Sequence, residues 1–218
     1  MATVQRSPEQ RLLLYGVSWQ EYSRALRAFA ERPSLRVTYD RGVLEFITLS
    51  LEHESIVRFF SLLILASTLE LGLPLKGGGS TTFRRRRRRR GLEPDECYWI
   101  ANEPHVRGKD QIDLRRDPPP DLALEVDSSY STLDRLGIYA ALEVPEVWRY
   151  DGHTLTFYVL GPDGHYVAVT QSQAIPQVAS AELTGMLALR GTMDENALFR
   201  HLQAWARQRF GTGGPTTP

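Results

Sequence analysis

The stretch PDLALEVD (120–127) combines an apolar strand pattern with acidic side chains. Successive side chains of a strand point to opposite faces, so the leucines and Val126 share one face, and Glu125 and Asp127 share the other. Burying two acids on one face is costly unless a cation compensates them. Together with Asp95, which precedes a second apolar strand, they could form an oxygen cage for a hard cation such as Mg²⁺.

Outward from this strand, the periodicity predicts alternating strands and helices. Arg41-Gly42 is typical of a hairpin turn, and Ser50 is typical of the N-cap of a long apolar helix expected to be buried. We expect strands at 35–40, 43–48, 96–101, 122–127, 146–151, 154–160 and 166–171, and helices at 18–32, 51–71, 131–142, 180–188 and 194–209. The sequence therefore predicts an α/β (α+β) fold, with a mixed central β-sheet flanked by helices.

Length and composition favour one globular domain. The chain has 218 residues, 42% hydrophobic and 24% charged, which predicts a single domain over 1–210 followed by a disordered tail over 211–218. No apolar run is long enough to span a membrane, and the first residues lack the apolar core of a signal peptide, so we expect a cytoplasmic protein without membrane contact. The single cysteine, Cys97, excludes an internal disulfide and a zinc site made of cysteines.

The basic residues are unevenly distributed. Of the 26 Lys and Arg residues, seven form one run, and the remaining 19 face 26 Asp and Glu, so the rest of the chain has a net charge of −7. The run consists of Arg84, Arg85, Arg86, Arg87, Arg88, Arg89 and Arg90. Such a cluster could bind nucleic-acid phosphates, or it could be a solvated hairpin or loop without a function.

Several common catalytic motifs are absent from the sequence. There is no G-x-S-x-G, no phosphate-binding P-loop, no G-x-G-x-x-G opening a helix and no H-E-x-x-H. The glycines at 77–79 lack the lysine and the following helix of a phosphate cradle. These absences argue against the common hydrolase, nucleotide-binding and zinc-protease classes.

The order of the remaining motifs resembles a known family. EPD (93–95), PDLALEVDSS (120–129), DR (134–135) with Tyr139, and VPEVW (144–148) together look like the Uma-type family of restriction endonucleases. The resemblance runs from about residue 10 to residue 190 and includes TYDRG (38–42) and EHE (52–54). It implies the PD-(D/E)XK nuclease core and cleavage of DNA phosphodiester bonds with a divalent metal.

The family pattern implies a metal, Mg²⁺ or Mn²⁺, held by an aspartate after a proline and by a strand glutamate. Two aspartates here follow a proline, Asp95 and Asp121. Asp121 lies four residues before Glu125 on one expected strand, which is about 13 Å at about 3.3 Å per residue and too far to share a metal easily. We therefore assign the metal to Asp95 and Glu125 and interpret Asp121 as a strand-entry or turn residue.

The lysine of the family pattern has no direct equivalent. Asp127 occupies its position after Glu125, and the family places a lysine on the following helix, four residues before a tyrosine. The matching residue here is Arg135, four before Tyr139. An arginine can stabilise a phosphoryl transition state but stays protonated, so it cannot act as a general base.

The start of the long helix carries two further candidates. His53 shares a helix face with the apolar Val57 and Phe60, so we expect it to point inward, toward the site. The resemblance also implies a first-helix acid as a metal ligand, for which Glu54 is the candidate. Both could instead be structural, as a histidine at the edge of the core and an acid favoured by the helix dipole.

We therefore carry two hypotheses from the sequence. The first is a Mg²⁺-dependent endodeoxyribonuclease that forms a homodimer on DNA, with the catalytic set Asp95, Glu125, Arg135, Asp127 and His53. The second is a weakened or inactive nuclease fold that serves as a nucleic-acid-binding or structural homodimer module. In that case Glu125 and Asp127 would form ion pairs with arginines, and Asp95 would be an ordinary turn residue.

Overall fold

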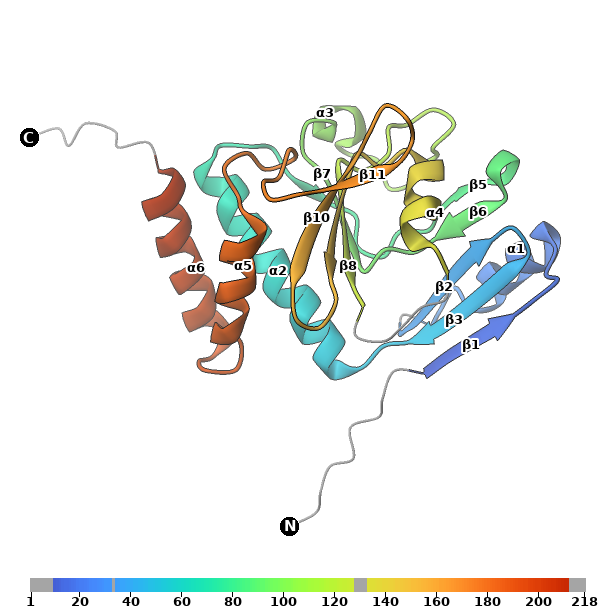
Figure 1. Ribbon diagram of the computed structural model, residues 1–218, viewed down its shortest axis with the longest axis horizontal. Helices are drawn as coiled ribbons and strands as arrows, with labels where there is room; N and C mark the ends of the chain where they lie inside the picture. Colours follow the sequence, from blue (N-terminus) through green and yellow to red (C-terminus); the bar gives the residue numbers. More distant parts are fainter. Residues whose placement is uncertain (1–9, 33, 128–132, 212–218) are drawn as a thin grey trace, which may run out of the picture.

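The computed structural model describes residues 10–32, 34–127 and 133–211. The strands form two sheets that lie beside each other (Figure 1). The first, which we call the N-terminal sheet, is antiparallel throughout. Its order is β1 (Gln10–Leu14), β3 (Val43–Thr48), β2 (Leu35–Asp40), β6 (Arg90–Leu92) and β5 (Phe83–Arg85).

The second sheet, the central sheet, is mixed. Its order is β11 (Tyr166–Val169), β10 (Leu155–Leu160), β9 (Glu146–Tyr150), β8 (Leu122–Val126), β7 (Glu96–Trp99) and β4 (Lys76–Gly77). Only β8 and β9 run parallel, with Glu125 opposite Arg149. Parallel neighbours need a crossover connection, and the connection here contains α4 (Arg135–Leu142).

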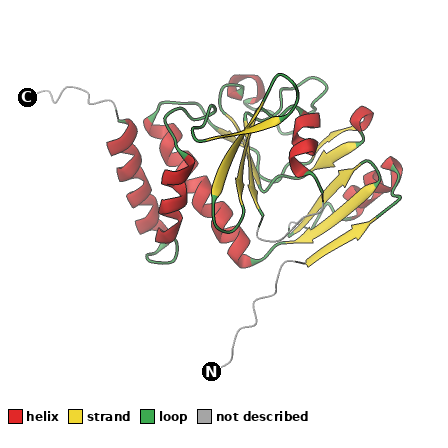
Figure 2. Ribbon diagram, in the orientation of Figure 1, coloured by secondary structure: helices red, strands yellow, loops and turns green. Residues whose placement is uncertain are grey.

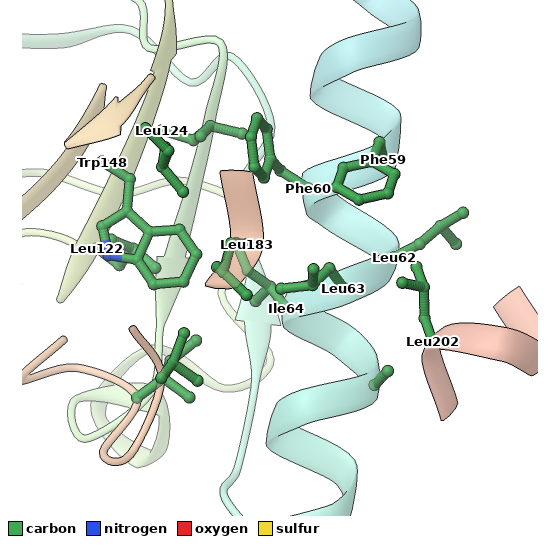
Figure 3. Packing of buried hydrophobic residues seen from close by; sticks show 14 of the residues in the cluster. Phe59, Phe60, Leu62, Leu63, Ile64, Leu122, Leu124, Trp148, Leu183 and Leu202 are labelled. Carbon is green, nitrogen blue, oxygen red and sulfur yellow. The ribbon is translucent and has the colours of Figure 1, made fainter. Parts of the chain in front are cut away.

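Helices cover both faces of the central sheet (Figure 2). Besides α4, the helices on this side of the molecule are α2 (Leu51–Glu70), α3 (Glu103–Val106), α5 (Ser180–Met186) and α6 (Glu195–Phe210). The remaining helix, α1 (Trp19–Ala28), packs on the N-terminal sheet. The buried apolar side of α2 packs on Leu122, Leu124 and Trp148 of the sheet (Figure 3). Ala123 and Val147 face the opposite way, in the cluster that includes α4. The alternation expected for PDLALEVD is therefore confirmed.

The expected α/β fold with a mixed central sheet is confirmed, and a second, antiparallel sheet that the sequence did not predict lies beside it. The hairpin β2–β3 pairs with β6, and the chain passes from β6 into β7 of the central sheet at Glu96. The link between the sheets contains Pro94, which has no N–H to continue a ladder of strand hydrogen bonds. This link also carries Asp95 and thus places that side chain at the junction of the two sheets.

The expected helix boundaries hold with small shifts. Ser50 caps α2, because its hydroxyl accepts from the backbone N–H of His53 at 3.1 Å. The first helix ends at Ala28, earlier than expected, because Phe29 leaves the helix and its ring packs edge-on against Phe46. The helix expected from 131 begins at Arg135, capped by Asp134, and residues 131–132 lie outside the described part.

Two expectations concern the ends and the surroundings of the chain. Among the described residues, none of the helices combines the length and the apolar character that crossing a membrane requires. The tail expected to be disordered, apart from Gly211, lies outside the described residues.

The packing of α2 predicts that substitutions on its buried side destabilise the protein far more than substitutions on its exposed side. Phe60 is fully buried, whereas Leu65 on the same helix is 44% exposed. Phe60→Ala should lower the free energy of unfolding by about 3–5 kcal/mol, because it removes apolar burial and leaves a cavity. Leu65→Ala, the matched control, should change it far less. Urea unfolding measures both, and similar losses in the two variants would contradict this packing.

Candidate functional site

Asp95 and Glu125 come together at the junction of the two sheets. In the antiparallel pair β7–β8, Glu96 lies opposite Leu124, so one further step places Asp95 across from Glu125. Both side chains are buried, and the backbone N–H of Val126 donates to Oδ2 of Asp95 at 2.7 Å. The expectation that Asp95 comes from a strand next to that of Glu125 thus agrees with the register.

His53 is the third member of this group. It is 3% exposed at the start of α2, and its Nε2 lies 3.0 Å from Oδ1 of Asp95. Because Val126 holds the other oxygen of Asp95, the carboxylate is fixed from two elements. Glu54, one position further along the helix, is exposed, so its position lends no support to a ligand role, which stays a prediction.

Arg135 occupies the space between the two sheets. Its Nη2 lies 2.8 Å from both carboxylate oxygens of Glu125. Its Nη1 donates to Oγ1 of Thr38 at 2.9 Å and lies 3.7 Å from Oε2 of Glu45, both on the N-terminal sheet. Tyr139, one turn further along α4, donates its hydroxyl to Glu125. Arg135 therefore connects the sheets through charged hydrogen bonds.

Burial and the neighbouring charges set the protonation of this group. Burial raises the pKa of Glu125, the charge of Arg135 lowers it, and the nearby Asp95 raises it again, with a net increase. Burial also raises the pKa of the Tyr139 hydroxyl, which the Glu125 charge raises further, so it remains a donor. For Arg135, burial lowers the pKa, but the Glu125 carboxylate outweighs it and keeps the guanidinium charged.

Asp127 is held by arginines from both sheets. Nη2 of Arg11 on β1 lies 2.9 Å from Oδ1, and Nη2 of Arg149 on β9 lies 2.7 Å from Oδ2. Arg11 also contacts Glu45 at 3.3 Å. Both strand acids, Glu125 and Asp127, therefore form ion pairs with arginines, as the structural alternative anticipated.

Asp121 lies elsewhere and has a structural role. Its Oδ2 accepts from the backbone N–H groups of Ile100 and Asn102 at 2.7 and 2.9 Å, and its Oδ1 accepts from the Asn102 amide at 2.6 Å. These bonds close the turn after β7, and they explain why that strand ends at Trp99 rather than at the expected residue 101.

A small pocket of about 160 Å³ opens beside this group. Its wall contains Glu125, Asp127, Arg135, Tyr139 and Arg149. Charged side chains from β8, the crossover helix and β9 thus line the same pocket.

The arginine run forms the hairpin β5–β6, whose tip is the 3₁₀ turn η1 (Arg86–Arg88). Two of its arginines are anchored: Arg85 pairs with Glu143, and Arg90 pairs with Asp40 at 2.9 Å. Arg89 approaches the Tyr39 hydroxyl at 3.5 Å. The other four, Arg84, Arg86, Arg87 and Arg88, are exposed, and within the described residues no ion pair holds them.

The side chains around Asp95 and Glu125 offer few oxygen donors to a divalent metal. Across residues 10–32, 34–127 and 133–211, no group of three or more His, Cys, Asp or Glu side chains has a metal-binding arrangement. Mg²⁺, however, is commonly held by one or two carboxylates, with water and substrate phosphates as its other ligands. Asp95 and Glu125, whose charges repel each other, fit such a two-carboxylate site.

The sequence did not point to the residues that pair with the strand acids from other parts of the chain. Glu45 is fully buried, and its place in the apolar strand VLEFIT was a detectable signal, because a buried acid needs a partner. Arg11, Arg149 and Thr38 carry no comparable local signal, since their contacts come from distant parts of the chain.

The contacts of Arg135 predict a stability test. Arg135→Met should cost about 3–5 kcal/mol in unfolding free energy, because it leaves Glu125 buried without its cation. Arg135→Met combined with Glu125→Leu should lose less than Arg135→Met alone, since both charges are then gone. Urea unfolding in EDTA measures the free energy of unfolding of the single and double variants. If the loss in the double variant equalled the sum of the two single losses, the importance of this ion pair would be contradicted.

Comparison with known proteins agrees with the resemblance seen in the motifs. The model of the family Uma2, described as "Putative restriction endonuclease", matches residues 19–190. A search among curated proteins found no match. The homodimer and the one-domain organisation stay predictions. Because the family model covers most of the chain, including β7, β8 and the crossover helix, the protein belongs to the Uma2 family of restriction-endonuclease-like proteins.

Proposed function

We propose that this protein is a Mg²⁺- or Mn²⁺-dependent endonuclease that hydrolyses DNA phosphodiester bonds. Membership of a family described by nuclease activity supports the general class. The observation that carries the proposal is the pair of buried carboxylates Asp95 and Glu125. Asp95 directly precedes β7 and lies across from Glu125 on β8, and Glu125 lines the small pocket. Placing two like charges together is costly, and a divalent cation would compensate them.

Asp95 and Glu125 would hold the metal. A bound divalent cation would act as a Lewis acid on the phosphodiester and stabilise the charge that develops there. His53 and the Val126 N–H hold Asp95 in place, and Arg135 and Tyr139 do the same for Glu125. Since its guanidinium remains protonated, Arg135 supplies positive charge and no general base.

A second candidate function is a nucleic-acid-binding module without turnover. It is favoured by the ion pairs that already neutralise both strand acids, Glu125 with Arg135, and Asp127 with Arg11 and Arg149. In such a module the arginine hairpin would bind nucleic acid while the carboxylates serve only stability. Metal binding separates the two candidates.

The metal proposal predicts a selective loss of binding. Asp95→Asn and Glu125→Gln should each abolish or reduce Mn²⁺ binding at least tenfold, because each removes one of two charged ligands. Glu195→Gln, which removes an exposed acid on α6, serves as the control and should bind like the wild type. Isothermal calorimetry measures binding, and plasmid nicking measures turnover. Wild-type protein that binds no metal, even with DNA present, would favour the second candidate.

The arginine hairpin predicts salt-dependent DNA binding. Replacing the three arginines Arg86–Arg88 by glutamine should weaken binding and make the slope of log K against log salt shallower by about 0.9 per lost phosphate contact. The control replaces Arg200, Arg207 and Arg209 on α6, which lies at the opposite end of the molecule (Figure 1). Fluorescence anisotropy at several salt concentrations measures both variants. Equal effects in the two would mean that net charge matters and the hairpin does not.

A further inference from the structure

We propose that Arg149 binds the substrate phosphate, and that Asp127 is the positioning residue that holds it there. This inference rests on the proposed function, because it assigns the cation that faces the phosphodiester in the same site. The phosphate-binding cation expected from the sequence was Arg135, and Arg149 takes its place here. Asp127, expected to be catalytic, becomes a positioning residue.

The register places Arg149 beside the carboxylate pair. Glu125 on β8 lies directly opposite Arg149 on the parallel strand β9. Side chains of directly paired residues in a sheet lie on the same face, and both residues line the pocket of about 160 Å³. The guanidinium of Arg149 thus extends from the neighbouring strand along the face that carries Glu125 and Asp127.

Exposure and partners distinguish the two arginines of the pocket. The Arg135 side chain is 11% exposed and contacts Glu125, Thr38 and Glu45, so its donors are largely committed to joining the sheets. The Arg149 side chain is 41% exposed, and its one ion pair among the described residues is with Asp127. A guanidinium has five N–H donors, so Arg149 retains donors for a ligand.

No lysine can fill this role from its observed position. Within the whole sequence the lysines are Lys76 and Lys109. Lys76 lies opposite Trp99, at the other end of β7 from Asp95, and its Nζ donates to the backbone carbonyl of Lys109. Lys109 pairs with Asp117 at 2.6 Å. The cation facing the pocket must therefore be an arginine.

Asp127 has the contacts expected of a positioning residue. Its carboxylate is 5% exposed and binds Arg149 on one side and Arg11 on the other, while its backbone N–H donates to the carbonyl of Tyr150. The ion pair with Asp127 engages Nη2 of Arg149 and leaves the other N–H groups of this guanidinium for a ligand. Asp127 thus orients a cation supplied by the adjacent strand, in place of a lysine on its own strand.

The chemistry of the pocket fits one phosphate group. Its volume equals that of several water molecules at about 30 Å³ each, which is enough for a single phosphodiester and too little for a base as well. A guanidinium binds phosphate oxygens through two parallel hydrogen bonds, which fixes both distance and orientation. The ligand class is therefore the nucleic-acid backbone.

The test uses a fluorescent DNA duplex and the full chain in EDTA, so that binding is measured without metal or cleavage. Arg149→Gln should weaken binding about tenfold and make the salt slope shallower by about 0.9, the value for one phosphate contact. Arg149→Lys should restore most of the slope. Arg58→Gln, which removes an exposed arginine of α2 paired with Glu195 of α6, is the control and should bind like the wild type.

The positioning role of Asp127 is tested by a double-mutant cycle. In an Asp127→Asn background, Arg149→Gln should cost only about twofold to threefold, because the unheld arginine already binds poorly. A full tenfold cost in that background would overturn the positioning role. Thermal unfolding of each variant checks that the protein is folded. If Asp127 were merely structural, its substitution would lower the unfolding temperature, but the effects of the two substitutions on DNA binding would be independent.

The outcomes separate this inference from the proposed nuclease. If Arg149→Gln binds and cuts DNA like the wild type, the inference fails while the nuclease stands. If the wild type binds DNA through Arg149 but cuts none with Mg²⁺ or Mn²⁺, the nuclease fails while the inference stands. A wild type that binds no DNA in EDTA overturns the role of Arg149, and metal binding by Asp95 and Glu125 is then judged separately.

Discussion

The ion pair between Glu125 and Arg135 is the interaction on which the rest of the structure depends. Glu125 lies inside the central sheet, where an isolated carboxylate would be strongly unfavourable. Arg135 compensates it and at the same time contacts Thr38 and Glu45 of the N-terminal sheet. The same guanidinium that makes the buried acid tolerable therefore holds the two sheets together, and their junction is where Asp95 lies.

This arrangement has a chemical consequence. A lysine is a single point charge that can lose its proton when buried, whereas an arginine stays charged and makes several directed hydrogen bonds. In this chain arginines compensate the strand acids and orient them, and a guanidinium cannot act as a general base. The carboxylates Asp95 and Glu125 remain as the ligands that a metal would use, and Arg149 remains as the cation with access to the pocket.

Local patterns predicted the elements well. The hairpin around Arg41-Gly42, the Ser50 cap and the alternation in PDLALEVD all depend on neighbours in sequence, and all are present in the structure. The choice of Asp95 over Asp121 also followed from simple strand geometry, and Asp121 indeed closes a turn. The division into two sheets was missed, because which strands pair depends on contacts between distant segments.

The sequence by itself determined which residues carry charge, which faces of the strands they occupy, and that Asp95 could meet Glu125 on an adjacent strand. Only the tertiary structure decided their partners. Arg11 reaches Asp127 across 116 residues, and Arg135 reaches Thr38 across 97. Contacts over such separations leave no periodic signal in the sequence, because they arise from the packing of one sheet against another, and so the arginines that complete the site became visible only in the folded chain.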